Sequence, residues 1–418
     1  MTAVPDHVVV VGAGLGGLRT VERLRSDGYA GRVTLVGAES HPPYDRPPLS
    51  KQVLDGSWEQ DRTVLCDLDG LADLGVTARL GCRAVAREGT GVRLDDGGWV
   101  TGDTVVLATG AVARRLPRQP QGVAVLRDRE DALALREAFG TARSMTVIGA
   151  GLIGAEAAWA ARRRGIAVTV LEQLAVPCAR VLGTEGGTLL ARLFEEAGVD
   201  LRCGVGVGAL KDRHTVELTD GGTVSSEIVL VAIGAVPDLS WLAGSVPLAG
   251  GGIACDTTGR VLDTPGVWAV GDAAAWADPA TGRHRREEHW TSAVEQAGRV
   301  ACGILGTAPP VSGPSYVWSD QFGLKVQLLG RPDPAAEVVA LHGKGTAGGP
   351  VRGTVLGYFT AGRLTAVASF GAPARFVRYR PLIAAGADRE AVLAQPDGGG
   401  AGPPAKPEGS GETPLPST

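Results

Sequence analysis

The stretch His7-Val8-Val9-Val10-Val11-Gly12-Ala13-Gly14-Leu15-Gly16-Gly17 decides the fold of this chain. A run of β-branched residues leads directly into a glycine-rich turn, an order that predicts a buried parallel strand followed by a helix N-terminus. In such a turn the first glycine makes the bend, the second lets the backbone approach a phosphate, and the third lets the helix pack on the strand. The stretch therefore predicts a βαβ unit that binds the pyrophosphate of a dinucleotide.

The same signature occurs a second time, where Met145–Ile148 precedes Gly149-Ala150-Gly151-Leu152-Ile153-Gly154. A dinucleotide site also needs an acidic residue about twenty residues further on, at the end of a second strand. Glu39 and Glu172 meet this requirement, and a carboxylate there accepts hydrogen bonds from ribose hydroxyls and repels a 2′-phosphate. Two sites predict two cofactors that exchange electrons. Two glycine-rich helix caps without ligands stay as the alternative, because 62 of the 418 residues are glycine.

Length and charge exclude several classes of protein. A chain of 418 residues exceeds a single core, so two or three domains are expected. The net charge of −4 argues against general nucleic-acid binding. No apolar run reaches the ~20 residues of a membrane span, and the N-terminus enters a strand without the basic region of a secretory signal. We therefore expect a cytoplasmic protein with no membrane partner.

The six cysteines are scattered, with no CxxC pair and no metal-like spacing. They are expected to be reduced structural thiols, and no metal site is expected. Flavoprotein disulphide reductases need a redox cysteine shortly after the first βαβ unit. Residues 40 to 55 contain none.

A proline-rich loop is the most specific motif of the chain: Pro43-Tyr44-Asp45-Arg46-Pro47-Pro48-Leu49-Ser50-Lys51. Together with shorter matches, it resembles the FAD-dependent NAD(P)H:ferredoxin reductases of the putidaredoxin reductase and biphenyl dioxygenase reductase type, within the glutathione reductase superfamily. The resemblance covers about residues 5 to 390. The shorter matches are Ala108–Gly110, Leu126–Arg127, Trp268–Asp272, Arg286–Trp290 and Trp318–Gln321.

The resemblance implies an α/β fold with two Rossmann-like dinucleotide-binding domains, one for FAD and one for NAD, and a C-terminal α+β domain. The FAD-binding domain is expected in two segments, 1–112 and 238–308, with the NAD-binding domain, 113–237, inserted between them. Residues 309–394 are expected to form the C-terminal domain. The tail, 395–418, is rich in Pro, Gly, Ser and Thr and is expected to be disordered.

The resemblance also assigns roles at the FAD site. Lys51 is expected near flavin N5, paired with Glu156 from the helix of the second glycine turn, so that a cation favours the electron-rich flavin and a carboxylate offsets its burial. Gly12, Gly14, Gly16 and Gly17 are expected at the pyrophosphate, Glu39 at the adenosine ribose, Val85 at the adenine, Arg46, Lys51 and Arg127 at the phosphates and flavin, and Asp272 at the ribityl chain.

At the nicotinamide, Trp290 and Glu288 are expected to stack on the ring and orient it, and Trp318 with Gln321 to wall the flavin. His289 and Ser292 depart from the family, which usually has a small residue and an asparagine there. Lys51, Glu156 and Trp290 are the expected catalytic residues. The remaining expected cofactor-binding residues are Ala108, Thr109, Gly110, Gly149, Gly151, Ile153, Gly154, Glu172, Arg180, Gly234 and His289.

The expected activity is that of an NADH-dependent ferredoxin reductase with noncovalent FAD. It would pass single electrons to an iron–sulfur ferredoxin that serves a cytochrome P450 or a ring-hydroxylating dioxygenase, as a monomer or homodimer. Two alternatives remain: a redox-dependent binding flavoprotein like apoptosis-inducing factor, and an NADH oxidase or disulphide reductase, against which the missing cysteine near residue 45 weighs. The expected contacts to an acidic ferredoxin are Arg283, Arg285, Arg286, Arg375, Arg378 and Arg380.

Overall fold

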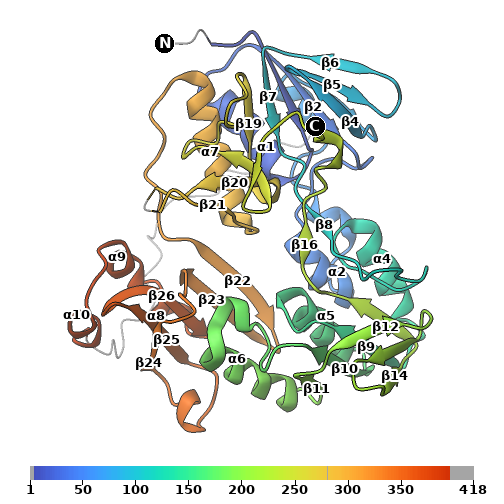
Figure 1. Ribbon diagram of the computed structural model, residues 1–418, viewed down its shortest axis with the longest axis vertical. Coiled ribbons are helices and arrows are strands. Elements are labelled where there is room, and N and C mark those ends of the chain that lie inside the picture. Colours follow the sequence, from blue (N-terminus) through green and yellow to red (C-terminus); the bar gives the residue numbers. More distant parts are fainter. Residues whose placement is uncertain (1–3, 280, 396–418) are drawn as a thin grey trace, which may run out of the picture.

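The computed structural model describes residues 4–279 and 281–395. The expected disorder of the tail concerns residues that, apart from Gln395, lie outside this range. Two parallel sheets and one antiparallel sheet form the body of the molecule (Figure 1). No helix in the described part of the chain has the length and apolar character needed to cross a membrane.

The first parallel sheet has the strand order β19-β7-β1-β2-β3. Its central strand β1 is the valine run, and Val8, Val9 and Val10 are fully buried. Helix α1 (Leu15–Ser26) begins directly after the first glycine turn and packs against α7 (Trp290–Leu305). The strands are β1 (His7–Val11), β2 (Arg32–Gly37), β3 (Val76–Leu80), β7 (Thr104–Leu107) and β19 (Val267–Ala269).

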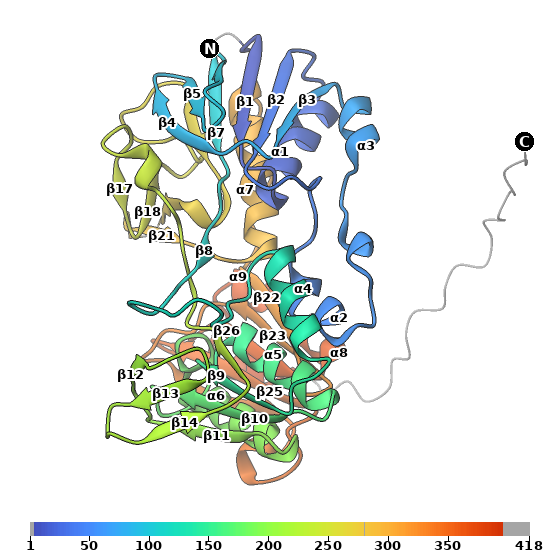
Figure 2. The ribbon, with the colours of Figure 1, turned by 90° about the vertical axis from the view of Figure 1, so that its right-hand side faces the viewer.

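The second parallel sheet has the order β11-β10-β9-β15 and repeats the arrangement, with α5 (Leu152–Arg163) after the second glycine turn. The chain leaves the first sheet through β8 (Val112–Ala113) and returns through β16 (Ala235–Val236), which pair with each other between the two halves (Figure 2). The strands are β9 (Ser144–Ile148), β10 (Ala167–Glu172), β11 (Asp200–Cys203) and β15 (Ile228–Val231), with α6 (Ala179–Glu196) between β10 and β11.

The C-terminal sheet is antiparallel, in the order β22-β23-β26-β25-β24, and three short helices follow it. It packs against α6, because Leu182, Leu189 and Leu193 share one hydrophobic cluster with its strands. The elements are β22 (Tyr316–Gln321), β23 (Leu324–Gly330), β24 (Glu337–His342), β25 (Thr354–Thr360), β26 (Arg363–Phe370), α8 (Pro373–Phe376), α9 (Tyr379–Ala384) and α10 (Arg389–Leu393). The expected α/β fold with two Rossmann-like units and a C-terminal α+β domain is therefore confirmed.

Smaller elements complete the fold. Three short sheets are formed by β4 (Ala84–Glu88), β5 (Gly91–Leu94) and β6 (Trp99–Thr101), by β12 (Val207–Leu210), β13 (Thr215–Leu218) and β14 (Thr223–Ser225), and by β17 (Leu248–Ala249), β18 (Gly252–Cys255), β20 (Ala274–Ala277) and β21 (His284–Arg286). The short helices are η1 (Pro47–Ser50), α2 (Gln52–Asp55), α3 (Leu68–Asp73) and α4 (Arg129–Ala138), with further 3-10 turns at Gln60–Thr63, Ser240–Leu242, Gly271–Ala273 and Gly345–Ala347.

Candidate functional site

A single cavity of about 930 Å³ reaches from the first glycine turn to the second. Both parallel sheets and strand β22 contribute to its walls. The expected residues that line it are Gly12, Gly14, Gly16, Glu39, Arg46, Lys51, Val85, Ala108, Thr109, Gly110, Arg127, Gly151, Ile153, Glu156, Gly234, Asp272, Glu288, His289, Trp290 and Trp318. Gly17, Gly149, Gly154, Glu172 and Arg180 are not among the lining residues.

The glycines of the first turn meet different demands. Gly12 has φ +119°, and a Cβ there would lie 2.1 Å from the carbonyl oxygen of Ala108. A Cβ on Gly17 would lie 1.9 Å from the carbonyl oxygen of Gly12, so Gly17 packs α1 onto the turn. A Cβ on Gly14 would meet nothing within 4 Å. The middle glycine thus faces open space in the cavity, as a phosphate-binding turn requires.

The second turn repeats this pattern. A Cβ on Gly149 or Gly154 would lie 2.5 or 2.1 Å from a backbone oxygen, whereas one on Gly151 would meet nothing within 4 Å. Glu172, the last residue of β10, supports the turn: its carboxylate accepts hydrogen bonds from the backbone N–H of Ala150 at 2.7 Å and of Leu174 at 2.8 Å. An ionised carboxylate has about four acceptor positions, so both oxygens keep capacity for ribose hydroxyls.

Glu39 follows strand β2 and lies in the wall of the cavity. Its carboxylate accepts hydrogen bonds from the Arg46 guanidinium and the Tyr44 hydroxyl, each at 2.5 Å. Burial raises the pKa of the Tyr44 hydroxyl, so this group stays protonated and donates. Two donors fix the carboxylate in place, a precondition for selective contacts to a ribose.

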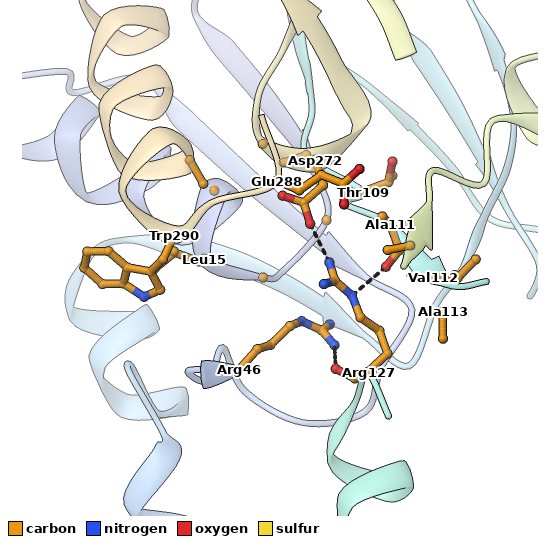
Figure 3. Close-up of a pocket in the computed structure, with 18 of the residues that line it drawn as sticks. Leu15, Arg46, Thr109, Ala111, Val112, Ala113, Arg127, Asp272, Glu288 and Trp290 are labelled. Atoms are coloured by element: carbon orange, nitrogen blue, oxygen red, sulfur yellow. Dashed lines mark hydrogen bonds and ion pairs between the residues drawn. The ribbon is translucent and has the colours of Figure 1, made fainter. Parts of the chain in front are cut away.

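Two arginines lie at the centre of the cavity (Figure 3). Arg127 pairs with Asp272 at 2.6 Å and donates to the carbonyl oxygen of Ala111 at 2.9 Å. The carbonyl oxygen of Arg127 in turn accepts a hydrogen bond from Arg46 at 2.9 Å. The protein therefore holds both guanidinium groups in fixed positions, where they suit an anionic pyrophosphate.

Lys51 and Glu156 form a buried ion pair, with 2.9 Å between Lys51 Nζ and Glu156 Oε1. The side chains are 12% and 2% exposed. Pro47 and Pro48 begin η1, which brings Lys51 to the wall of the cavity, and Lys51 Nζ also donates to the carbonyl oxygen of Pro47 at 3.1 Å. The pairing that the resemblance implies is present in the structure.

Aromatic side chains form the wall between α7 and β22. Trp290 donates its indole N–H to Asp45 at 2.7 Å and packs edge to face on Trp318, with 6.0 Å between ring centroids. The expectation that Gln321 shares this wall is wrong: Gln321 is fully buried on the other face of β22. Side chains alternate between the faces of a strand, so residues three apart, such as Trp318 and Gln321, point in opposite directions.

The residues that depart from the family lie beside Trp290. Burial lowers the pKa of His289 below its usual 6.5, although Asp272 and Glu288 act in the opposite direction. The imidazole is therefore neutral at pH 7. Ser292 is buried and donates to Glu287 at 2.5 Å.

The residues present fit a dinucleotide at each turn. Gly14 and Gly151 leave open space beside helix N-termini, and two fixed arginines, each paired with one carboxylate, keep further N–H groups as donors. The hydroxyl of Thr109 is buried in the cavity wall and has no hydrogen-bond partner within the part of the chain that the structure describes. A buried hydroxyl without a partner is costly, so it is a candidate ligand contact.

Comparisons with known proteins show which families the chain matches. Residues 6–297 match the pyridine nucleotide-disulphide oxidoreductase family, and residues 316–397 match a reductase C-terminal family. The chain is 35% identical to the chlorobenzene dioxygenase ferredoxin reductase component of Cupriavidus sp. (strain PS12), over 91% of this chain and 92% of that protein. It is 33% identical to the benzene 1,2-dioxygenase system ferredoxin–NAD(+) reductase subunit of Pseudomonas putida, over 91% and 93%.

Solved structures are similar as well. The chain superposes on the reductase in the covalent putidaredoxin reductase–putidaredoxin complex with a TM-score of 0.86 and 28% identity, over 93% of this chain and 96% of that one. It superposes on the ferredoxin reductase for the CYP199A2 system of Rhodopseudomonas palustris with a TM-score of 0.83 and 31% identity, over 90% and 93%.

Proposed function

This chain belongs to the pyridine nucleotide-disulphide oxidoreductase family, and we propose on that premise that it is an NADH-dependent ferredoxin reductase. It is a flavoprotein oxidoreductase whose cofactors are FAD and NAD. FAD, when bound, supplies the chemistry by accepting a hydride from NADH and releasing the electrons singly. The protein supplies binding, alignment and charge.

One observation carries the proposal: a single cavity connects two glycine turns of the same design, and the Lys51–Glu156 pair lies in its wall. Hydride transfer needs two rings in contact in a site from which water is excluded. We propose that the first turn, Glu39, Arg46 and Arg127 hold FAD and that the second turn and Glu172 hold NADH.

The described residues then have separate tasks. We propose that Lys51 keeps a positive charge beside the redox-active end of FAD, and that Glu156 offsets the cost of burying that charge. Trp290 and Trp318 exclude water from the hydride path. Asp45 fixes the plane of the Trp290 indole through the 2.7 Å hydrogen bond.

The proposed electron acceptor is an iron–sulfur ferredoxin that binds transiently. Relatives are named as components of dioxygenase systems and one structural relative serves a CYP system, so we propose an oxygenase of either class as the final acceptor. Both turns and the ion pair belong to one chain, which suits a monomer or a homodimer. All six cysteines are unpaired, which fits the reducing conditions of the cytoplasm.

The test uses the purified holoprotein. Heating should release FAD rather than FMN, anaerobic NADH should bleach its absorbance, and cytochrome c reduction should depend on added ferredoxin. A colourless protein that FAD does not reconstitute would contradict the whole assignment. If the flavin bleaches slowly and no ferredoxin accelerates the reaction, a redox-dependent binding protein is favoured. If the rate of NADH consumption depends on the concentration of oxygen or of an added disulphide, the oxidase or the disulphide reductase is favoured.

A further inference from the structure

The carboxylate of Glu156 has more partners than the ion pair alone. Oε1 accepts hydrogen bonds from Lys51 Nζ at 2.9 Å and from the hydroxyl of Ser319, and Oε2 accepts one from Ser50 at 2.5 Å. Ser50 and Ser319 are 2% and 1% exposed. Burying a carboxylate beside one cation leaves oxygen lone pairs unsatisfied, and here the two hydroxyls satisfy them.

These donors come from different parts of the molecule. Ser50 and Lys51 are neighbours in the loop of the first glycine domain, so they move together. Ser319 lies on β22 of the C-terminal sheet, 163 residues along the chain from Glu156. It is thus a contribution of the C-terminal domain to the wall behind the proposed flavin site.

Gln321 sets the direction of the Ser319 hydroxyl. Its side-chain amide donates to Ser319 Oγ at 2.9 Å, and both residues lie on the face of β22 opposite Trp318. A hydroxyl has one hydrogen, so an oxygen that accepts from Gln321 can direct that hydrogen to Glu156. With the amide turned round, the Ser319 hydroxyl would donate to Gln321, and a lone pair of its oxygen would face the carboxylate.

Strand β22 is also fixed against the second glycine domain. Phe322, the residue after β22, packs on Phe194 and Trp159, with 4.6 and 5.8 Å between ring centroids. Thr291 at the start of α7 donates to the carbonyl oxygen of Tyr316 at 2.5 Å. The Ser319 hydroxyl is therefore held in place from both sides.

We propose that Ser319 is a positioning residue, which holds the Glu156 carboxylate under Lys51 and makes the C-terminal domain part of the hydride-accepting site. The inference rests on the proposed function. Without the hydroxyl, Glu156 Oε1 has one hydrogen-bond donor fewer. Its attraction for the Lys51 ammonium is then less offset, and Lys51 is drawn further from the cavity. Less positive charge then acts on the reduced cofactor, so reduction becomes less favourable and slower.

The experiment compares Ser319→Ala with Ser319→Thr in the FAD-loaded protein. Ser319→Ala should move the equilibrium between oxidised and reduced FAD about tenfold towards the oxidised form, which corresponds to a midpoint potential about 30 mV more negative. The reduction rate at saturating NADH should fall about tenfold, while half-saturation by NADH changes less than about twofold. Ser319→Thr keeps a hydroxyl and should restore both values.

A matched control separates positioning from general damage. Ser369 is a fully buried serine of β26 whose hydroxyl accepts a hydrogen bond from the backbone of Ala372 and does not contact Glu156. Ser369→Ala should lower the free energy of unfolding by an amount comparable to that of Ser319→Ala, and it should leave the midpoint potential of FAD unchanged. In a Glu156→Gln background the additional effect of Ser319→Ala on the potential should largely vanish, because its partner carboxylate is gone.

The outcomes are distinguishable. The proposed function is overturned if the wild-type protein holds no FAD, or if NADH does not reduce the FAD that it holds. A normal wild type together with an unshifted potential in Ser319→Ala overturns this inference alone. If Ser319→Ala does not yield folded protein, Ser319→Cys carries the test, because a thiol is a much weaker hydrogen-bond donor than a hydroxyl. A negative shift of the midpoint potential supports the inference, and a wild-type potential overturns it.

Discussion

Gly14 and Gly17 stand three residues apart and are glycine for different reasons. Gly14 has φ −85°, and its Cβ position is open, so Gly14→Ala should fold normally. Its methyl group would take space at the proposed phosphate position, and FAD affinity should fall at least tenfold, or about 1.4 kcal/mol. Thermal unfolding of the apoprotein and fluorescence titration with FAD measure the two effects.

Gly17→Ala is the contrasting variant, because its Cβ would overlap the carbonyl oxygen of Gly12. It should lower the unfolding temperature of the apoprotein itself. Equal FAD affinity in Gly14→Ala and wild type would contradict the placement of a phosphate at this turn.

Glu172 should make the enzyme prefer NADH to NADPH. A 2′-phosphate in place of a ribose hydroxyl would lose hydrogen bonds and face a carboxylate, effects worth about 2–4 kcal/mol, or about thirty-fold or more in kcat/KM. Glu172→Gln should narrow the ratio of the two kcat/KM values to less than about tenfold. The variant also disturbs the hydrogen bonds to Ala150 and Leu174, but damage to the turn would lower both values equally and leave the ratio unchanged.

His289 should make stability depend on pH. Because burial lowers its pKa in the folded protein below the usual 6.5, the unfolded chain takes up a proton that the folded one does not as the pH falls through 6.5. The contribution of the neutral His289 imidazole to the free energy of unfolding is complete above pH 6.5. It is lost as the pH falls from 6.5 towards the lowered pKa of the folded protein. When the pH is lowered from 7.5 to 5.5, the unfolding temperature of the wild type should therefore fall further than that of His289→Gln.

Direct titration checks this interpretation. The chain has only six histidines, so the imidazole signal that His289→Gln removes can be assigned by NMR. A midpoint at or above 6.5 for that signal would show that Asp272 and Glu288 outweigh burial.

At the scale of elements, α6 is interrupted and the C-terminal sheet supports the interruption. Gly183 has φ +68° and ψ −173°, which breaks the regular helix one turn from its start. The buried hydroxyl of Tyr358 on β25 donates to the carbonyl oxygen of Leu182 beside the break, at 2.7 Å. A carbonyl next to a helix break needs such an outside donor.

Tyr358→Phe should therefore weaken the contact between the C-terminal sheet and α6. Leaving a buried carbonyl without its donor costs about 1–2 kcal/mol, equivalent to a few degrees in the apparent unfolding temperature. FAD content and NADH specificity should not change, because Tyr358 lies outside the cavity lining. An unchanged unfolding temperature would show that this hydrogen bond contributes little to the contact.

The elements that local patterns encode could be predicted, and contacts between distant elements could not. The valine run, the glycine turns and the acid after each second strand specify the two βαβ units. The Lys51–Glu156 pair is predictable only from the resemblance to the ferredoxin reductases, because no spacing rule joins residues 105 positions apart. Ser319 carries no local signal, because a serine in a strand is ordinary until the neighbouring domain places a carboxylate against it.

At the scale of the whole molecule, charge should guide the ferredoxin. Arg283, Arg285 and Arg380 are exposed, as an electrostatic contact requires. Arg286 differs from the expectation: its side chain is 15% exposed and contacts Glu288 and the carbonyl oxygen of Asp272 inside the site. We therefore assign any steering of an acidic partner to Arg283, which precedes β21, to Arg285 on β21 and to Arg380 on α9.

Raising the salt concentration from about 50 to 500 mM shortens the Debye length to about 4 Å, so ferredoxin-dependent cytochrome c reduction should fall several-fold. Ferricyanide reduction needs no docking and should change less than about twofold. Arg285→Glu should lower kcat/KM for ferredoxin about fivefold, and Arg93→Glu, an exposed arginine on β5, should not. If both acceptors gave the same salt profile, electrostatic docking would not limit the reaction, and the acceptor assigned here would have to be reconsidered in favour of the oxidase or the redox-dependent binding protein.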